Sequence, residues 1–279
     1  MNKLELQKMA NEVRKGILTG VHAAKAGHPG GSLSAAEVFT YLYFEEMNID
    51  PKNPEDPDRD RFVLSKGHTA PGLYATLANR GYFPVEDLLT LRQIGSHLQG
   101  HPCKQHTPGI DMSSGSLGQG ISAACGMALA GKLRNKDYRV YTLLGDGEIE
   151  EGQVWEAAMF AAAKKLDNLV VIVDNNGLQI DGPIEEVNSP YPIDKKFESF
   201  NFHVINVEDG NDFDQLAAAF HEARETKGVP TAIIMKTVKG KGVYFMENQV
   251  SWHGSAPNDE QYEAAMEELK KVEEALCQK

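Results

Sequence analysis

Several features that would place this chain in a specialised class are scarce. There are only three cysteines, Cys103, Cys125 and Cys277, and an odd number at this wide spacing predicts neither a disulfide framework nor a cysteine zinc site. No apolar run reaches the length of a bilayer span, and the charged N-terminus lacks the apolar core of a signal peptide. We therefore expect a soluble, cytoplasmic protein that does not associate with a membrane.

Positive charge is also in deficit. The 28 lysines and arginines stand against 40 aspartates and glutamates, which gives a net charge of −12. Binding to nucleic acid without sequence preference needs a dense positive surface, so we expect no nucleic-acid partner. Any phosphate group should instead be held locally, by a metal ion, backbone N–H groups and a few side chains.

The 279 residues, 41% of them hydrophobic, are enough for a sizeable core. Apolar strands alternate with helical segments, and the strand interiors are continuously apolar, which predicts a doubly wound, mainly parallel α/β sheet with helices on both faces. With no linker and no internal repeat, we expect residues 1–279 to form a single domain. The expected strands are 61–65, 139–144, 169–174, 202–207 and 231–237.

Two helix boundaries are predicted from local signals. Ser34 is followed three residues later by Glu37, the spacing of a capping box, so we expect a helix to begin at Ser34. A second helix is expected over residues 84–94, which begins at Pro84 and ends before Gly95.

Two polar loops follow successive strands of the predicted βαβ unit. Gly145-Asp146-Gly147 follows the first strand, and Asn175-Asn176-Gly177 follows the second. Each loop alone is more often a simple turn. In a parallel sheet, however, both loops lie at the carboxyl ends of neighbouring strands, so Asp146 and Asn176 should meet where open α/β sheets bind ligands. A carboxylate and an amide oxygen suit Mg²⁺ or Ca²⁺ with phosphate as a further ligand.

The sequence motifs of this chain resemble those of the transketolase family. The stretch from GDGEIEEGQVWEA to VVIVDNNGLQIDG resembles the thiamine diphosphate motif. Five further segments appear in the order of the family's N-terminal domain: AGHPGGSLSAAE, FVLSKGHTAPGLYA, GSHLQGHP, SSGSLGQGISAACGMALA and WHG. The resemblance covers nearly the whole chain. It implies the thiamine diphosphate-binding fold and transfer of a two-carbon ketol unit between sugar phosphates.

The resemblance also implies roles for individual residues. Asp146, Asn176 and the backbone carbonyl of Leu178 would hold the metal ion. His28, His101 and His253 would lie near the reacting carbon and the donor sugar. The residues implied to line the cofactor are His68, Gly115, Leu117, Gly147, Glu151, Asn176 and His253.

Physical reasoning supports a catalytic role for these histidines, because imidazoles transfer protons and stabilise oxygen charge near neutral pH. His28, His68, His101 and His253 each lie beside a glycine in an expected loop. The other five histidines are interpreted as structural or surface residues.

Four glutamates follow Asp146. We attribute Glu148 and Glu150 to favourable charge at a helix N-terminus. By resemblance, Glu151 and Glu156 lie at a subunit contact near the cofactor and take part in the catalytic site.

The family's next domain, which binds the pyrimidine ring and supplies a glutamate to it, would follow beyond Lys279. We therefore expect a partner, the C-terminal transketolase subunit, in an α2β2 assembly with sugar phosphates as substrates. Cys103 stands where the family pattern has an acidic residue, so the contacts to the donor sugar stay open there. The family's residues for the acceptor's phosphate lie partly outside this chain, so the identity of the sugars stays open as well. The competing interpretations are the α subunit of a 2-oxo acid dehydrogenase, a deoxyxylulose phosphate synthase and a non-catalytic paralogue.

Overall fold

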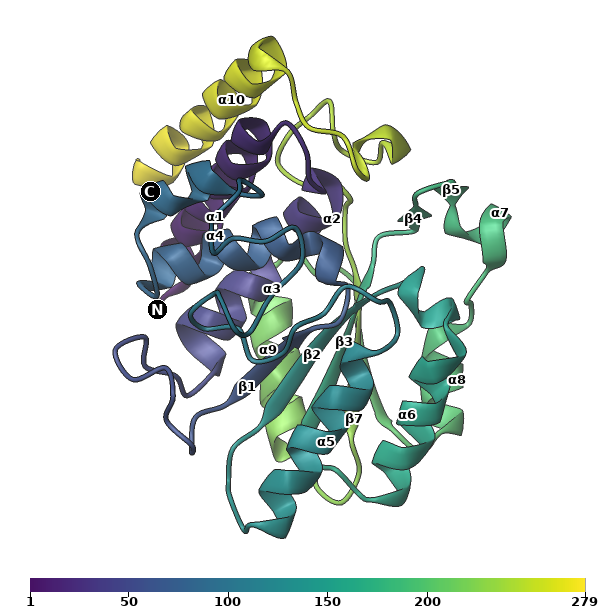
Figure 1. The fold of residues 1–279 in the computed structure, drawn as a ribbon. Helices are drawn as coiled ribbons and strands as arrows, with labels where there is room; N and C mark the ends of the chain where they lie inside the picture. The colour runs from purple at the N-terminus through teal and green to yellow at the C-terminus, as the bar shows by residue number, and fades with distance from the viewer. Residues whose placement is uncertain (279) are drawn as a thin grey trace.

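The computed structural model describes residues 1–278, and its centre is a five-stranded parallel sheet (Figure 1). The strand order is β1-β2-β3-β7-β6, and all four neighbouring pairs are parallel. The predicted doubly wound α/β class is therefore confirmed. The strands are β1 Arg61–Leu64, β2 Val140–Gly145, β3 Leu169–Asn175, β6 His203–Val207 and β7 Thr231–Lys236.

The central strand β3 explains why the sheet forms. Its run LVVIVD is buried throughout, and branched side chains suit a strand that is covered on both faces. Its register against β2 runs from Val140 opposite Leu169 to Gly145 opposite Asp174. Because these two strands end side by side, the loops that carry Asp146 and Asn176 leave the sheet at the same edge.

Helices cover both faces, and alternate strand residues divide between two cores. Leu143 and Ile172 belong to the core on one face, whereas Leu144 and Val171 belong to the core on the other. The helices of the first face are α1 Lys3–Ala24, α2 Pro29–Ser34, α3 Ala36–Tyr41, α4 Ala70–Arg80 and α9 Phe213–Glu225. Those of the second are α5 Gly120–Leu133, α6 Gly152–Ala163 and α8 Ile193–Ser199.

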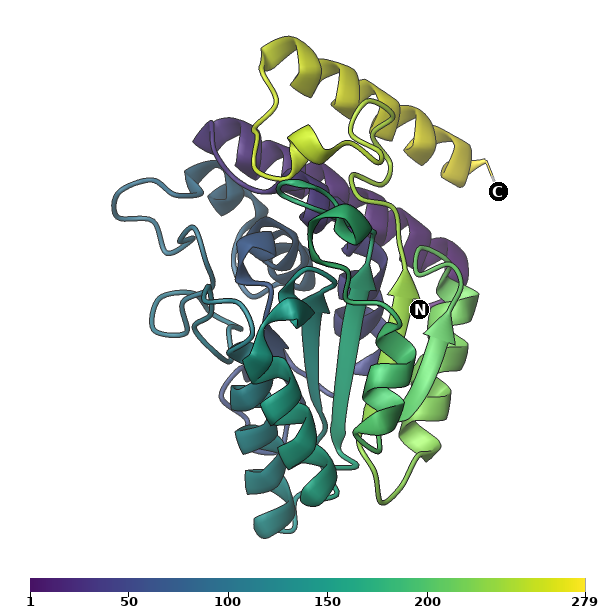
Figure 2. The same cartoon turned by 90° about the vertical axis from the view of Figure 1, so that its right-hand side faces the viewer.

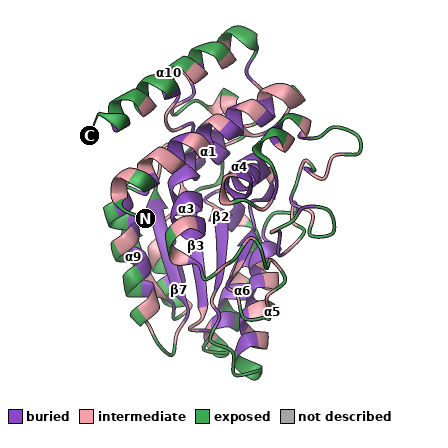
Figure 3. Cartoon of the chain, turned by 90° about the vertical axis from the view of Figure 1, so that its left-hand side faces the viewer, coloured by how far each residue is buried: buried purple, intermediate pink, exposed green. Residues whose placement is uncertain are grey.

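Helix α10, Asp259–Cys277, packs along α1 on the outside of the molecule (Figure 2). Its outer surface is exposed, whereas the strands are buried (Figure 3). None of the helices formed by residues 1–278 is both long and apolar enough to cross a membrane. The short elements are a π-helical turn at Leu42–Glu46, 3₁₀ turns at Gly67–Thr69, Val85–Thr90, Glu148–Glu150 and Val250–Trp252, strands β4 Leu178–Gln179 and β5 Gly182–Pro183, and helix α7 Ile184–Asn188.

Both helix boundaries predicted from local signals are wrong. Ser34 ends α2 instead of starting a helix, because its hydroxyl donates to Asp174 Oδ2 at 2.6 Å, on the end of β3. The segment 84–94 forms only the 3₁₀ turn Val85–Thr90. The chain turns at Arg92, which adopts a φ of 60° and donates its N–H to Leu98 O at 2.9 Å.

Small residues let α5 lie close to the sheet. A Cβ built at Gly120 would be 2.6 Å from Ser65 Cα and from Ser65 Oγ, so the start of α5 touches the chain as it leaves β1. At Gly126, in the same helix, nothing lies within 4 Å of an added Cβ. The two glycines therefore differ in packing while sharing one helix.

We predict opposite effects when each glycine is replaced by alanine. Gly120→Ala should lower the free energy of unfolding by about 1–3 kcal/mol, since the added methyl overpacks a backbone contact. Gly126→Ala should raise it by about 0.5–1 kcal/mol through helix propensity. Urea denaturation of both variants measures this, and equal effects of the same sign would contradict the close packing.

Candidate active site

A cavity of about 290 Å³ lies at the carboxyl ends of β2 and β3. It joins residues that are far apart in sequence and is the point where the two polar loops meet. Its lining is His28, Gly31, Lys66, His68, Gly115, Leu117, Gly145, Asp146, Gly147, Glu148, Asn176, Leu178, Gln179, Ile180, Lys239 and His253.

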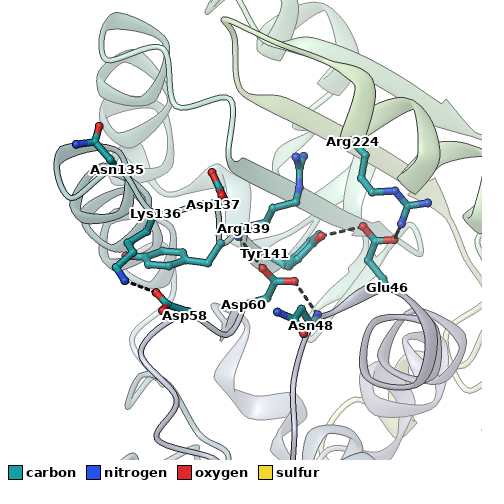
Figure 4. A pocket seen from close by; sticks show the side chains of 11 residues that line it. Glu46, Asn48, Asp58, Asp60, Asn135, Lys136, Asp137, Arg139, Tyr141 and Arg224 are labelled. Carbon is teal, nitrogen blue, oxygen red and sulfur yellow. Dashed lines mark hydrogen bonds and ion pairs between the residues drawn. The ribbon is translucent and has the colours of Figure 1, made fainter.

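A larger cavity, about 600 Å³, lies at the amino ends of the strands (Figure 4). Its charges are mostly paired within the protein: Arg224 pairs with Glu46, and Lys136 pairs with Asp58 at 2.6 Å. None of the residues singled out from the sequence lines it. The chemistry therefore points to the smaller cavity, although the other one is larger.

Asp146 and Asn176 come together as the sequence predicts. The Asp146 carboxylate accepts hydrogen bonds from Gly147 N at 2.9 Å and from Gly177 N at 2.6 Å, so it is tied directly to the loop that carries Asn176. Asp146 is only 3% exposed, and burial, followed by the nearby charge of Asp174, raises its pKa to about 7. A buried carboxylate with a raised pKa is stabilised by a cation beside it.

The oxygen atoms in this corner fit a hard cation. Besides the Asp146 carboxylate there are the Asn176 amide oxygen, which accepts from Leu178 N at 3.2 Å, and the Leu178 carbonyl. The Leu178 carbonyl accepts a hydrogen bond from Lys239 Nζ at 3.0 Å, so it already faces a positive charge. Within residues 1–278 no group of three or more histidine, cysteine or acidic side chains could hold a metal, so a cation site here has one carboxylate and neutral oxygens.

Behind this corner lies a buried ion pair that sequence reasoning missed. Lys66 Nζ pairs with Asp174 and donates to Gly31 O at 3.2 Å, while Thr237 and Ser34 donate their hydroxyls to the same carboxylate. Burial alone would raise the pKa of Asp174, but the Lys66 ammonium and the hydroxyl donors hold it below its usual range.

Asp174 also orients a predicted metal ligand. Asn176 Nδ2 donates to Asp174 Oδ2 at 3.3 Å, and the amide oxygen on its other side accepts from Leu178 N, so both ends of the amide are held in place. The ends of β1, β3 and β7 and the turn at α2 are thus joined through one carboxylate.

Three histidines that line the cavity pack against one another. The His28 and His68 ring centroids are 5.1 Å apart, His68 and His253 are 5.2 Å apart, and His28 and His253 are 5.5 Å apart. Burial, then surrounding positive charge, lowers the pKa of His28 to about 4 and that of His253 to about 3, and it lowers the pKa of His68 well below its usual value. All three imidazoles are therefore neutral at pH 7.

Two hydrogen-bonding details make this cluster suited to a ligand. His28 Nδ1 is buried without any partner among the described residues, so a bound polar group has an unsatisfied atom to meet. His253 Nδ1 lies 3.0 Å from Lys239 Nζ. The ammonium can only donate, so Nδ1 accepts and His253 carries its proton on Nε2. Burial lowers the pKa of Lys239 to about 8, against the opposing charge of Asp146.

Glu148 departs from its predicted role. It is buried, and it accepts from Ser65 Oγ at 2.5 Å, Gly118 N at 2.9 Å and Gly145 N at 3.1 Å. It therefore ties the loop of residues 115–118 to the end of β2, and the interpretation as a charge that favours a helix N-terminus is wrong. Glu150 is only partly buried and bonds Gln179 and Asn188.

Three predicted residues lie outside the cavity. His101 is exposed, and its ring lies against Gly115, where an added Cβ would be 3.1 Å from His101 Cγ. Glu151 precedes α6 as its N-cap, and Glu156 follows on the same helix, both exposed. The other predicted residues all line the cavity: His28, His68, Gly115, Leu117, Asp146, Gly147, Asn176, Leu178 and His253.

The buried pair gives a direct prediction about stability. Lys66→Met should lower the free energy of unfolding by about 3–5 kcal/mol, because Asp174 loses its cation while remaining buried. The exposed pair between Lys195 and Glu198 offers a matched control, and Lys195→Met should cost less than about 1 kcal/mol. The double variant Lys66→Met with Asp174→Asn should recover part of the loss in urea titrations. A loss as small as the control's would show that the pair does not hold the strand ends together.

Comparison with known proteins identifies the family of the chain. The family model described as transketolase, thiamine diphosphate binding domain, matches residues 6–272. A 6-deoxy-6-sulfo-D-fructose transketolase subunit of a Clostridium species is 46% identical over 269 residues, covering 96% of this chain and 98% of that protein. One subunit of the apulose-4-phosphate transketolase of Phocaeicola vulgatus is 43% identical over 273 residues, covering 98% of this chain and 96% of that protein.

Solved structures give the same result. The crystal structure of transketolase from Campylobacter jejuni superimposes with a TM-score of 0.91 at 33% identity, covering 97% of this chain and 43% of that one. The chain thus spans less than half of that transketolase. Because the family model covers most of the chain, the chain belongs to the transketolase family and carries its thiamine diphosphate-binding domain.

Proposed function

We propose that this chain is the N-terminal subunit of a split transketolase, folded as a single thiamine diphosphate-binding domain, which transfers a two-carbon ketol unit from a ketose phosphate to an aldose phosphate. The observation that carries the proposal is the cavity itself. Three neutral imidazoles, two lysines and the Asp146–Asn176 corner line one space at the carboxyl ends of neighbouring strands.

The inner end of the cavity would hold the cofactor's diphosphate. Asp146, Asn176 and the Leu178 carbonyl would bind Mg²⁺ or Ca²⁺, and Lys66 and Lys239 add positive charge beside it. Gly147 allows close backbone approach there. When bound, thiamine diphosphate supplies the stabilisation of negative charge on carbon that ketol transfer needs.

The histidines would move protons on the sugar hydroxyls. A neutral imidazole can accept a proton from a hydroxyl and return it, and the low pKa values of His28 and His253 keep them in that form near pH 7. His28 offers its unpartnered Nδ1, and His253 offers Nε2–H as a donor. His68, which packs against both of these rings, would position the cofactor.

A second protein would complete the site. The relatives matched over nearly their whole length are named as subunits, which supports a partner that carries the pyrimidine-binding domain in an α2β2 assembly. The exposed residues Glu151, Glu156 and His101 lie outside the cavity and are available to such a partner. The alternative as a 2-oxo acid dehydrogenase α subunit is not favoured, since the relatives are transketolases.

The substrates are proposed to be sugars with an acidic group. One relative is named for a sulfonated fructose and another for apulose 4-phosphate, so both a sulfonate and a phosphate belong in the test. An activity screen with a panel of phosphorylated and sulfonated sugars would identify the physiological donor and acceptor.

We predict that the chain alone does not turn over. A coupled transketolase assay with thiamine diphosphate and Mg²⁺ should show ketol transfer only after a partner chain, obtained by pull-down with the purified protein, is added. Normal turnover by the chain alone would refute the split-subunit proposal. Binding of thiamine diphosphate without transfer by the pair would favour the non-catalytic paralogue.

The metal corner gives a separate prediction. Asp146→Ala in the assembled pair should weaken thiamine diphosphate binding by about 100-fold or more, since the cation loses its charged ligand. Isothermal titration calorimetry with Mg²⁺, and again with a chelator, measures this. The chelator should weaken thiamine diphosphate binding by the parent protein but have little further effect on binding by the variant. Asp181→Ala, an exposed residue near the same corner, is the control and should bind like the parent.

A further inference from the structure

One buried glutamate joins three segments at the wall of the catalytic cavity. Glu148 lines the cavity and is 2% exposed. Its Oε1 accepts from Ser65 Oγ at 2.5 Å and from Gly118 N at 2.9 Å, and its Oε2 accepts from Gly145 N at 3.1 Å. The donors come from the chain after β1, from the loop before α5 and from the end of β2, so a single carboxylate holds these three segments together.

The loop of residues 115–118 has few hydrogen bonds besides this one. Among the residues that the structure describes, Gly118 has the only backbone N–H of the four that donates a hydrogen bond, and its acceptor is Glu148. Gly118 adopts a φ of 81°, a conformation that glycine adopts without strain. Ser116 and Leu117, which precede it, are exposed. Glu148 therefore fixes the end of the loop that leads to α5.

The other end of the loop is held by a hydroxyl and by close packing. Ser114 Oγ donates to Leu64 O at 2.6 Å, and a Cβ built at Gly67 would be 2.8 Å from Gly115 N. Leu117 lies between the two ends and lines the cavity. Its position is thus set from both sides, with Glu148 as the support on one of them.

The metal corner of the same cavity is anchored independently. The Asp146 carboxylate accepts two backbone N–H groups of its own, and Gly145 pairs with Asp174 in the ladder between β2 and β3. Removal of the Glu148 carboxylate would take away one 3.1 Å contact at Gly145 and none of those bonds. The loop and the metal corner therefore depend on different carboxylates.

Only a carboxylate satisfies the donors around Glu148. Each of its three hydrogen bonds places a donor against it, so a glutamine at this position would bring an NH₂ group against one of those donors. Burial raises the pKa of Glu148, while the three donors and the charge of Lys66 act in the opposite direction.

We propose that Glu148 is a positioning residue, which fixes the loop of residues 115–118 as the surface that receives the ring portion of thiamine diphosphate. The inference rests on the proposed function and names the support of one part of that site. The loop offers backbone groups and the apolar side chain of Leu117 to the cavity, which suits the rings, whereas the charged corner at Asp146 suits the diphosphate. Loss of the support should therefore affect the rings and spare the diphosphate.

The test uses this chain assembled with its partner and compares two ligands by isothermal titration calorimetry with Mg²⁺. Thiamine diphosphate would reach both parts of the cavity, whereas inorganic pyrophosphate would reach only the corner at Asp146. The variants are Glu148→Gln, Glu148→Ala and Ser65→Ala. The control is Glu263→Gln, which removes an exposed carboxylate on α10. Thermal unfolding is measured for every variant.

We expect both Glu148 variants to weaken thiamine diphosphate binding about 10- to 100-fold and to leave pyrophosphate binding within about twofold. Ser65→Ala should weaken the cofactor less, because the two N–H donors remain, and Glu263→Gln should match the parent.

A purely structural role would weaken both ligands alike, so equal losses would overturn the proposal, as would unchanged affinity for thiamine diphosphate. If the Glu148 variants do not fold, Ser65→Ala decides with the same two ligands. A loss confined to thiamine diphosphate then supports the proposal, and an equal loss or no loss overturns it.

Failure of the proposed function is recognised separately, because a parent pair that binds neither ligand would refute it. Amide hydrogen exchange in the full chain then tests the hold of Glu148 on the loop. The Gly118 N–H should exchange at least about tenfold faster in Glu148→Gln than in the parent, with the exchange of the Gly177 N–H unchanged. Equal exchange rates for Gly118 in the two proteins would overturn the inference.

Discussion

The buried contact between Lys66 and Asp174 is the constraint on which the site depends. The carboxylate is fully buried at the end of β3, and a lone charge there would be expensive without its cation and hydroxyl donors. Because those donors come from the loop after β1, from Ser34 and from Thr237, satisfying one charge brings several strand ends together. The same carboxylate orients the Asn176 amide, so the stability of the sheet edge and the geometry of the metal corner have a common cause.

Burial, and after it the positive charge around the cavity, lowers the pKa of the cavity histidines. Lys66, Lys239 and Arg92 oppose protonation of neighbouring imidazoles in the same direction as burial. Neutral imidazoles can both accept and donate, whereas imidazolium groups could only donate. The lysines thus have two effects, since they favour bound phosphate and keep the proton-transfer groups in their useful form.

More of the fold than of the site could be predicted from the sequence. Parallel strands with continuous apolar runs and a βαβ unit define the sheet, and they place Asp146 beside Asn176 without knowledge of the rest. The helix expected at Ser34 failed because its hydroxyl has a stronger tertiary partner in Asp174 than any local cap. Glu148, Lys66 and Asp174 were missed because their roles come from burial against distant segments. The signal for Lys66 was its place beside Gly67 and His68 in a motif already noted, and Lys239 likewise precedes Gly240.

Overall charge and local charge have opposite signs in this protein. A net charge of −12 repels anions at a distance, yet Lys66 and Lys239 line the cavity. The electrostatic attraction for an anion therefore acts only over short distances, where burial reduces screening by salt. A cation at Asp146 would offset the charge of that carboxylate, so the metal and the lysines would together make a positive inner end.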